Sequence, residues 1–387
     1  NGYTTGITTA TIASTSIANL LDANNGLDDK SNNQAADNAY TITIAGGDAS
    51  ANAGKLNSID DLTSVDVDVT AVTALTGTYS EVNTFYLAAK TANGANPTIS
   101  NASNIATINI TGTVTDAANL KTLRDGFVVL KAGAVTDITN VSEIQGAYAE
   151  LTAVKTMDTS NTLTGLGTQA ITADANVAIS VANANTLNGY GTGVTTATIA
   201  STSVADLLDT NNGLDDKSQN QNTDNAYTIT IAGGDASSDA GQLASIRDLT
   251  SVDVDVTAVT TLTGTLTELN TFHTNRADYS TYSNITTITL DAGVISDAAA
   301  LKTLHDNYRT DIKTNGVTTN VANITGISGA YSELTALKTL SNDTTLSNFG
   351  TQALTEDAAS ISVANANTLN GYTTGITTAT IASTSIA

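Results

Sequence analysis

The chain repeats itself over a long period, and this repetition limits its possible folds more than any other feature. The phrase "NGYTTGITTATIASTSIA" begins at Asn1, returns with few changes at Asn188, and returns unchanged from Asn370 to Ala387. The sequence therefore predicts two copies of a long repeat, residues 1–187 and 188–369, and the start of a third copy, residues 370–387. We expect the chain to be a segment of a longer repetitive protein, in which residues similar to "NLL" follow Ala387.

Each long copy contains about six shorter units of similar build. A unit begins with alternating apolar and polar residues, as in "YTITI" from Tyr40 to Ile44. A polar turn follows, and then a helix-like pattern such as "DAANLKTLRD", with an Asp N-cap and with Leu120 and Leu123 three residues apart. The units average about 31 residues, which is typical of stacked repeats.

This organisation predicts a parallel β-solenoid with about six coils per long repeat. Each coil contributes one strand, and a short helix or loop closes its other side. Returns of roughly 20–40 residues between strands favour parallel pairing. A β/α arrangement like that of leucine-rich repeats is the alternative to a pure β-helix. Aromatic residues are only 4% of the chain and Trp is absent, so a narrow core of Ala, Val, Ile and Leu is expected.

The negative net charge limits the kinds of molecule that the chain can bind. The chain has 14 Lys and Arg against 37 Asp and Glu, a net charge of −23. Nucleic acid and anionic membranes are poor partners for such a surface, whereas divalent cations, above all Ca²⁺, are natural counterions. Cysteine is absent, which excludes disulfides and thiol chemistry. No apolar run approaches the length of roughly 18 residues that a membrane span needs, so membrane insertion is not expected.

Two acidic patterns are candidate calcium sites. In "VDVDV" two carboxylates lie two residues apart on one face of a predicted strand, and in "LLDANNGLDDKS" Asp and Asn surround a Gly. The candidate ligands are Asp66, Asp68, Asp253 and Asp255 on the strands, and Asp22, Asp28, Asp29, Asp209, Asp215 and Asp216 in the loops. The spacing matches neither an EF-hand nor a calcium-binding nonapeptide. The alternative is that these residues form solvated turns with Asx caps.

Catalysis is not expected. The chain has two histidines, His273 and His305, and the first copy has Tyr86 and Arg124 at the matching positions. If each repeat were an active module, both copies would need the base. Ser and Thr hydroxyls are weak nucleophiles without a base nearby. An enzyme such as a polysaccharide lyase would also need a basic cleft, and Lys and Arg are scattered.

Two further patterns suggest alternative uses of the surface. Thr-x-Thr pairs such as Thr9/Thr11 and Thr41/Thr43 resemble the ladders of ice-binding proteins, but charged residues interrupt them. Asn-x-Ser/Thr sequons are possible glycosylation sites. They begin at Asn101, Asn109, Asn140, Asn284, Asn323 and Asn342.

The phrases "VTALTGTYSEV" (Val72 to Val82) and "NGYTTGITTATIASTSIANL" (Asn1 to Leu20) resemble those of giant Thr/Ala/Gly-rich tandem-repeat proteins on the surface of marine cyanobacteria and other aquatic bacteria. The resemblance covers the whole chain and includes no catalytic motif. It implies an extracellular or cell-surface location and a bulk structural role.

The expected function is therefore structural. We expect a segment of a long repetitive extracellular filament, sheath or surface layer. Its partners would be copies of itself, joined end to end or bundled laterally, with surface polysaccharide and divalent cations as further candidates. No cofactor other than calcium is indicated. The alternative is the stalk of a bacterial adhesin, with ligand-binding loops or a tip outside this segment.

Overall fold

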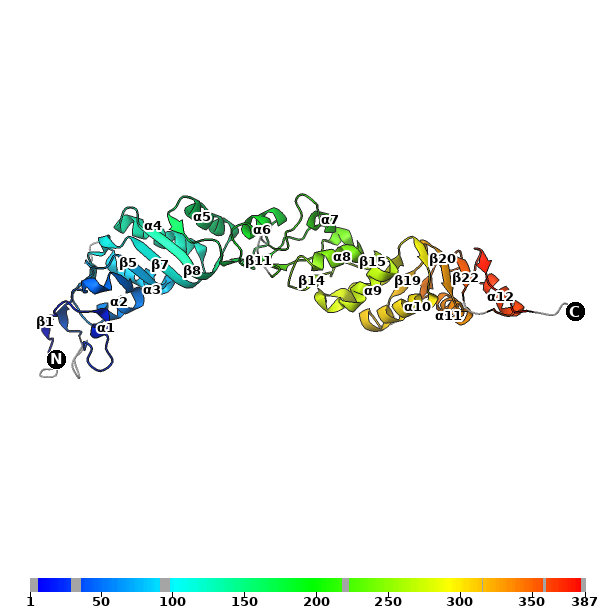
Figure 1. Ribbon diagram of the computed structural model, residues 1–387, viewed down its shortest axis with the longest axis horizontal. Coiled ribbons are helices and arrows are strands. Elements are labelled where there is room, and N and C mark those ends of the chain that lie inside the picture. The colour runs from blue at the N-terminus through cyan, green and yellow to red at the C-terminus, as the bar shows by residue number, and fades with distance from the viewer. Residues whose placement is uncertain are drawn as a thin grey trace. The chain divides into compact units, whose positions relative to one another are not determined.

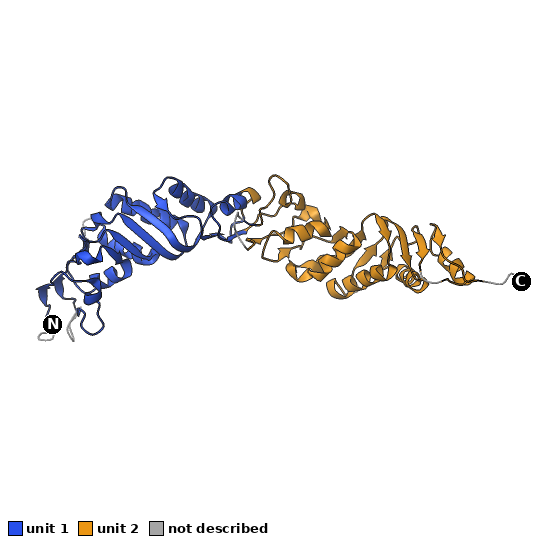
Figure 2. Ribbon diagram, in the orientation of Figure 1, with its two compact units in different colours: residues 1–178, 183–197, 217–222 blue, residues 179–182, 198–216, 223–387 orange. Residues whose placement is uncertain are grey.

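A computed structural model describes residues 6–28, 36–90, 98–217, 223–314, 316–357 and 360–383. The chain divides into two compact units (Figure 2). Unit 1 comprises residues 1–178, 183–197 and 217–222, and unit 2 comprises residues 179–182, 198–216 and 223–387. The division into long repeats at residues 187 and 188 remains a prediction from the sequence.

Strands and helices alternate along both units (Figure 1). From the N-terminus to β11 the strands are β1 (Thr9–Thr11), β2 (Ala39–Thr41), β3 (Ser50–Asn52), β4 (Val67–Asp68), β5 (Ala74–Thr78), β6 (Ile99–Ser100), β7 (Thr107–Val114), β8 (Val135–Gly146), β9 (Leu163–Thr164), β10 (Ala170–Ala173) and β11 (Thr195–Thr198). The helices of the same stretch are α1 (Ile17–Leu20), α2 (Ala53–Asp60), α3 (Tyr79–Ala89), α4 (Ala117–Leu130), α5 (Tyr148–Thr159) and α6 (Val181–Asn188).

Unit 2 continues the alternation. Its strands are β12 (Ala226–Thr228), β13 (Ser237–Asp239), β14 (Val254–Asp255), β15 (Thr261–Gly264), β16 (Tyr279–Ser280), β17 (Thr287–Leu290), β18 (Gly293–Ile295), β19 (Thr318–Asn320), β20 (Ile324–Gly329), β21 (Leu346–Ser347), β22 (Ala353–Glu356) and β23 (Thr377–Thr378). Its helices are α7 (Val204–Leu207), α8 (Ala240–Arg247), α9 (Leu266–Thr274), α10 (Ala298–Asn307), α11 (Tyr331–Asn342) and α12 (Val363–Asn370).

The prediction of a β-solenoid is wrong. The fold is α/β: twelve α-helices lie within the described residues, and the strands are divided among several separate parallel sheets. Unit 1 has one larger sheet, in the order β11-β10-β8-β7-β5-β3 with β9 also paired to β8, and the separate pairs β1-β2 and β4-β6. Unit 2 has the sheets β13-β15-β17-β19-β21 and β18-β20-β22-β23 and the pair β14-β16.

The helical segments account for much of this error. The sequence predicts a short helix or loop on the other side of each coil, but α4 has 14 residues. Its N-cap Asp116 accepts hydrogen bonds from two backbone N–H groups of the first turn, and Leu120 and Leu123 are buried. A helix of this length covers a sheet as a second layer. In unit 1, α3, α4 and α5 pack in this way on β5, β7 and β8.

Local sequence explains how each helix begins directly after its strand. Thr78 ends β5, and its Oγ1 accepts a hydrogen bond from the Glu81 N–H at 3.3 Å. The Glu81 Oε2 in turn accepts from the Thr78 N–H at 2.8 Å, which completes a capping box. This fixes the direction of α3, so that Val82 and Phe85 are fully buried. The same box recurs in residues 265–268 of unit 2.

A buried glutamine holds the turn before β10. Gln169 is 1% exposed. Its Oε1 accepts from the Gly167 N–H at 2.8 Å, and its Nε2 donates to the carbonyls of Ile138 at 3.0 Å and Gly165 at 2.9 Å. Gln352 repeats this arrangement in unit 2. The side chain therefore pairs with three backbone groups of the turn, and it satisfies the Ile138 carbonyl, which would otherwise be buried without a partner.

Candidate functional site

The paired strand aspartates lie at the ends of two short strands, one in each unit. Asp66 and Asp253 are exposed just before β4 and β14, and Asp68 and Asp255 end these strands. Within the described residues, one group of three acidic side chains has ligand atoms in mutual reach, and it contains none of the predicted ligands.

The carboxylates that end β4 and β14 instead hold the following turns. The Asp68 Oδ1 accepts from the Thr70 N–H at 2.9 Å, the Thr70 hydroxyl at 2.5 Å and the Asn101 Nδ2 at 2.9 Å. Partial burial disfavours the charged form, but these hydrogen bonds outweigh it and lower the pKa of Asp68. Asp255 accepts from the N–H and hydroxyl of Thr257 in the same way.

The loop aspartates also cap turns. The Asp22 Oδ1 accepts from the backbone N–H groups of Asn24 at 2.9 Å and Asn25 at 2.7 Å, and these bonds lower its pKa. Asp209 makes the same pair of contacts in the second copy. Asp28 and Asp215 are exposed, Asp216 is half-buried, and Asp29 lies outside the described residues. The Asx-cap interpretation thus accounts for Asp22 and Asp209.

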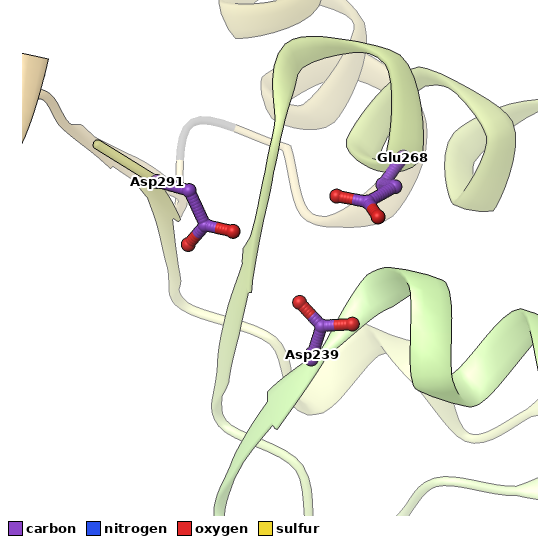
Figure 3. Close-up of side chains that lie close together, drawn as sticks. All are labelled: Asp239, Glu268 and Asp291. Carbon is purple, nitrogen blue, oxygen red and sulfur yellow. The ribbon is translucent and has the colours of Figure 1, made fainter. Parts of the chain in front are cut away.

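The sequence did not predict the acidic cluster that forms among the described residues of unit 2 (Figure 3). It consists of Asp239, Glu268 and Asp291, whose carboxylate oxygens lie within 4.8 Å of one another. Asp239 ends β13, Glu268 lies in the first turn of α9 after β15, and Asp291 follows β17. Because β13, β15 and β17 are neighbouring parallel strands, their carboxyl ends bring these residues to one edge of the sheet.

Two members of this acidic cluster also cap helices. The Asp239 Oδ1 accepts from the Gln242 N–H at 2.8 Å, and the Glu268 Oε2 accepts from the N–H and hydroxyl of Thr265, both at 2.8 Å. The bonds from Thr265 lower the pKa of Glu268. For Asp291, partial burial and then the charges of the other two carboxylates raise the pKa. A proton or a hard cation would relieve this repulsion.

The first repeat provides a natural comparison. The positions that match the acidic cluster are Asn52, Glu81 and Thr111, so a single carboxylate remains there. The capping roles persist, because the Asn52 Oδ1 accepts from the Lys55 N–H at 3.0 Å and Glu81 completes its capping box. The helices therefore need their caps, but the fold does not need three carboxylates at this edge.

We predict that Asp291→Thr, which introduces the residue of the first repeat, stabilises unit 2 at neutral pH. The expected gain is roughly 0.5 kcal/mol, because solvent screens charges that are not buried. Since the folded-state pKa of Asp291 is raised, the charged form carries a penalty at neutral pH. That penalty fades as the pH falls through the raised pKa towards the ordinary value of 3.8. Thermal melts at pH 7 and pH 4 measure the difference; equal gains at both values would contradict the repulsion.

The two histidines occupy different structural settings. The Nε2 of His273 lies 3.0 Å from the Asp311 Oδ2, which also pairs with Arg276 at 3.2 Å. His305 is 1% exposed, and its Nδ1 lies 2.8 Å from the Thr319 hydroxyl. Burial lowers the pKa of His305. A polar contact with Asp311 accounts for His273, and a buried hydrogen bond accounts for His305.

Comparison with known proteins does not assign this chain to a family. No protein-family model matches the chain, and no curated protein is similar to it. Among the helices of the described residues, none is both long enough and apolar enough to cross a bilayer.

Proposed function

We propose that this chain is a non-enzymatic structural protein, a segment of a long repetitive extracellular filament, sheath or surface layer. The observation that carries the proposal is that the two long repeats build corresponding elements with corresponding buried contacts. The three-way hydrogen bonding of Gln169 returns at Gln352, and the capping box of α3 returns at α9. Selection for a specific site would not require such duplication, whereas extending a continuous structure does.

Two further observations support a role without catalysis. Neither histidine has a histidine counterpart in the first repeat. The acidic cluster of Asp239, Glu268 and Asp291 is also confined to the second repeat, so it does not recur as a module. The extracellular location rests on the acidic, Thr-rich and Cys-free composition and on the resemblance to bacterial surface proteins.

Immunogold electron microscopy of intact, unpermeabilised source cells tests the proposal. Antibodies against the purified chain are expected to label surface fibres or layers along their whole length. Label confined to permeabilised cells would overturn the extracellular role. Label restricted to a short zone beneath a differently built tip would favour the adhesin stalk instead.

A further inference from the structure

A groove of about 300 Å³ lies beside the acidic cluster, within unit 2. Its lining comes from the start of α9, with Thr265 and Leu266, and from β18 and the residues just before it. The buried side chains of Leu290 and Ile324 belong to the same lining. Asp291 also lines the groove, so one carboxylate of the acidic cluster can contact a molecule that occupies it.

The second repeat has one residue more than the first at this place. Thr111 of the first repeat stands directly before a glycine, and the pair Asp291–Ala292 takes its position in the second. In unit 1 the strand β7 continues through Thr111 without a break. In unit 2 the same stretch is divided into β17 and β18, because one extra residue reverses the direction of every side chain after it. The insertion therefore adds a carboxylate and interrupts the strand at the groove.

Two further differences between the repeats make this groove more apolar. Leu266 replaces Tyr79 at the start of the helix, and Val294 replaces Thr113 on the strand. Both residues line the groove, together with the buried Ile295, and the Val294 side chain is 66% exposed. The groove thus combines an apolar surface with a carboxylate. A molecule that fits it is apolar along most of its length and positively charged at one end.

The spacing of the acidic cluster fits an ammonium group. Asp239, Glu268 and Asp291 each offer one oxygen within 4.8 Å of the other two, and their carboxylates face a common space (Figure 3). An ammonium nitrogen carries three N–H donors in tetrahedral directions. Acceptors at a charge-assisted distance of about 2.8 Å from that nitrogen are about 4.6 Å apart. One ammonium group can therefore contact all three carboxylates.

We propose that this groove binds a primary alkyl ammonium ion, with the nitrogen at the acidic cluster and the alkyl chain along Leu266 and Val294. The charge relieves the repulsion among the three carboxylates, and the chain covers the exposed valine. Ca²⁺ fits less well, because it takes roughly 6–8 oxygen ligands and the adjoining surface is apolar. The same ammonium chemistry occurs in free amines and in lysine side chains.

Titration of the full chain with pentylammonium at pH 7, followed by amide NMR, tests the proposal. Saturable shifts are expected for the amides of residues 265–267 and 291–296. Pentanol should cause no saturable shift, because it has the chain without the charge. Ammonium should bind about tenfold more weakly, because it has the charge without the chain. The matching amides of unit 1, residues 78–80 and 111–115, are the internal control and should not shift.

Two substitutions separate the carboxylate from the apolar surface. Asp291→Asn keeps the size of the side chain and removes one charge, so pentylammonium should bind about tenfold more weakly. Leu266→Tyr introduces the residue of the first repeat and fills part of the groove. It should weaken the binding of pentylammonium and leave that of ammonium unchanged. Asp253→Asn is the matched control, because it removes an exposed charge of unit 2 that does not line the groove.

Nα-acetyl-lysine methylamide distinguishes the two sources of the ammonium group. If it binds as pentylammonium does, the groove accepts lysine side chains; if pentylammonium alone binds, the groove is a site for free amines. Shifts that do not saturate, or that are equal with pentanol, overturn the inference. Saturation of the same amides by Ca²⁺, with no response to pentylammonium, would also overturn it and indicate a metal site.

Amine binding goes beyond the proposed structural role and does not rest on it. Saturable shifts together with immunogold label inside cells would support the groove and refute the filament. Label along surface fibres together with no response to pentylammonium would do the reverse.

Discussion

Gln352→Leu is expected to destabilise unit 2 by about 3 kcal/mol, because it removes three hydrogen bonds to the backbone, each contributing about 1 kcal/mol, and leaves the buried Val321 carbonyl without a partner. The Oε1 of Gln352 accepts from the Gly350 N–H, and its Nε2 donates to the carbonyls of Val321 and Asn348, at 2.8–3.0 Å. The side chain is 1% exposed and its bond to Val321 is buried, whereas the bonds to Gly350 and Asn348 are partly buried. Leucine has a similar volume, and the loss would therefore measure hydrogen bonding more than packing.

Hydrogen exchange locates this effect within the molecule. Amides of β20 and β22 should lose protection, and amides of unit 1 should keep theirs. Gln242→Leu is the matched control, because its side chain is exposed in α8, and a change within about 0.5 kcal/mol is expected. Equal effects of the two substitutions would show that the buried glutamine does not support the turn.

Acidification from pH 7.5 to 5.5 is expected to weaken unit 2 through His305. Burial lowers the folded-state pKa of this histidine below 6.5; the charge of Asp306 opposes the shift, and those of Arg309 and Lys302 add to it. The unfolded chain therefore binds more protons in this window. Stability is complete above the unfolded pKa and falls as the pH drops through 6.5 towards the folded value, by at most about 1.4 kcal/mol per pH unit.

Chemical denaturation at a series of pH values measures this linkage. His305→Gln should remove most of the loss, because glutamine can still reach the Thr319 hydroxyl and does not titrate. Residues 1–178 contain no histidine and serve as the internal control, whose amide protection should change little over the same range. An unchanged slope in His305→Gln would assign the pH dependence to other groups.

Local patterns predicted the positions of several elements and core residues. The alternation in "YTITI" placed Tyr40, Ile42 and Ile44 on one face, and all three are buried. Asp116 is the N-cap of a helix, as its place before an Ala- and Leu-rich segment indicated. These predictions succeeded because side-chain direction along a strand and capping of a helix depend on neighbours within a few residues.

Features that depend on the pairing of distant strands were not predicted. Asp239, Glu268 and Asp291 are well separated in sequence, and they meet only because β13, β15 and β17 align in a particular register. Comparison of the two repeats could have indicated the cluster, because Asn52 and Thr111 of the first repeat are both replaced by Asp in the second. The division of strands among separate sheets was not predicted either. An alternation of apolar and polar residues predicts a strand, but it does not determine which other strand it pairs with.

A long-range hydrogen bond at the start of α1 has a consequence for biosynthesis. The Asp48 carboxylate that receives the Ile17 N–H lies 31 residues further along the chain, and Asp235 stands in the same relation to Val204. Ser16 and Ser203 cap these helices locally, but a ribosome must complete the following segment before the first helical N–H groups gain their carboxylate partners. Folding of such a nascent chain should lag behind its synthesis by about one short repeat. Each newly synthesised segment completes its contacts only after the next segment has left the ribosome.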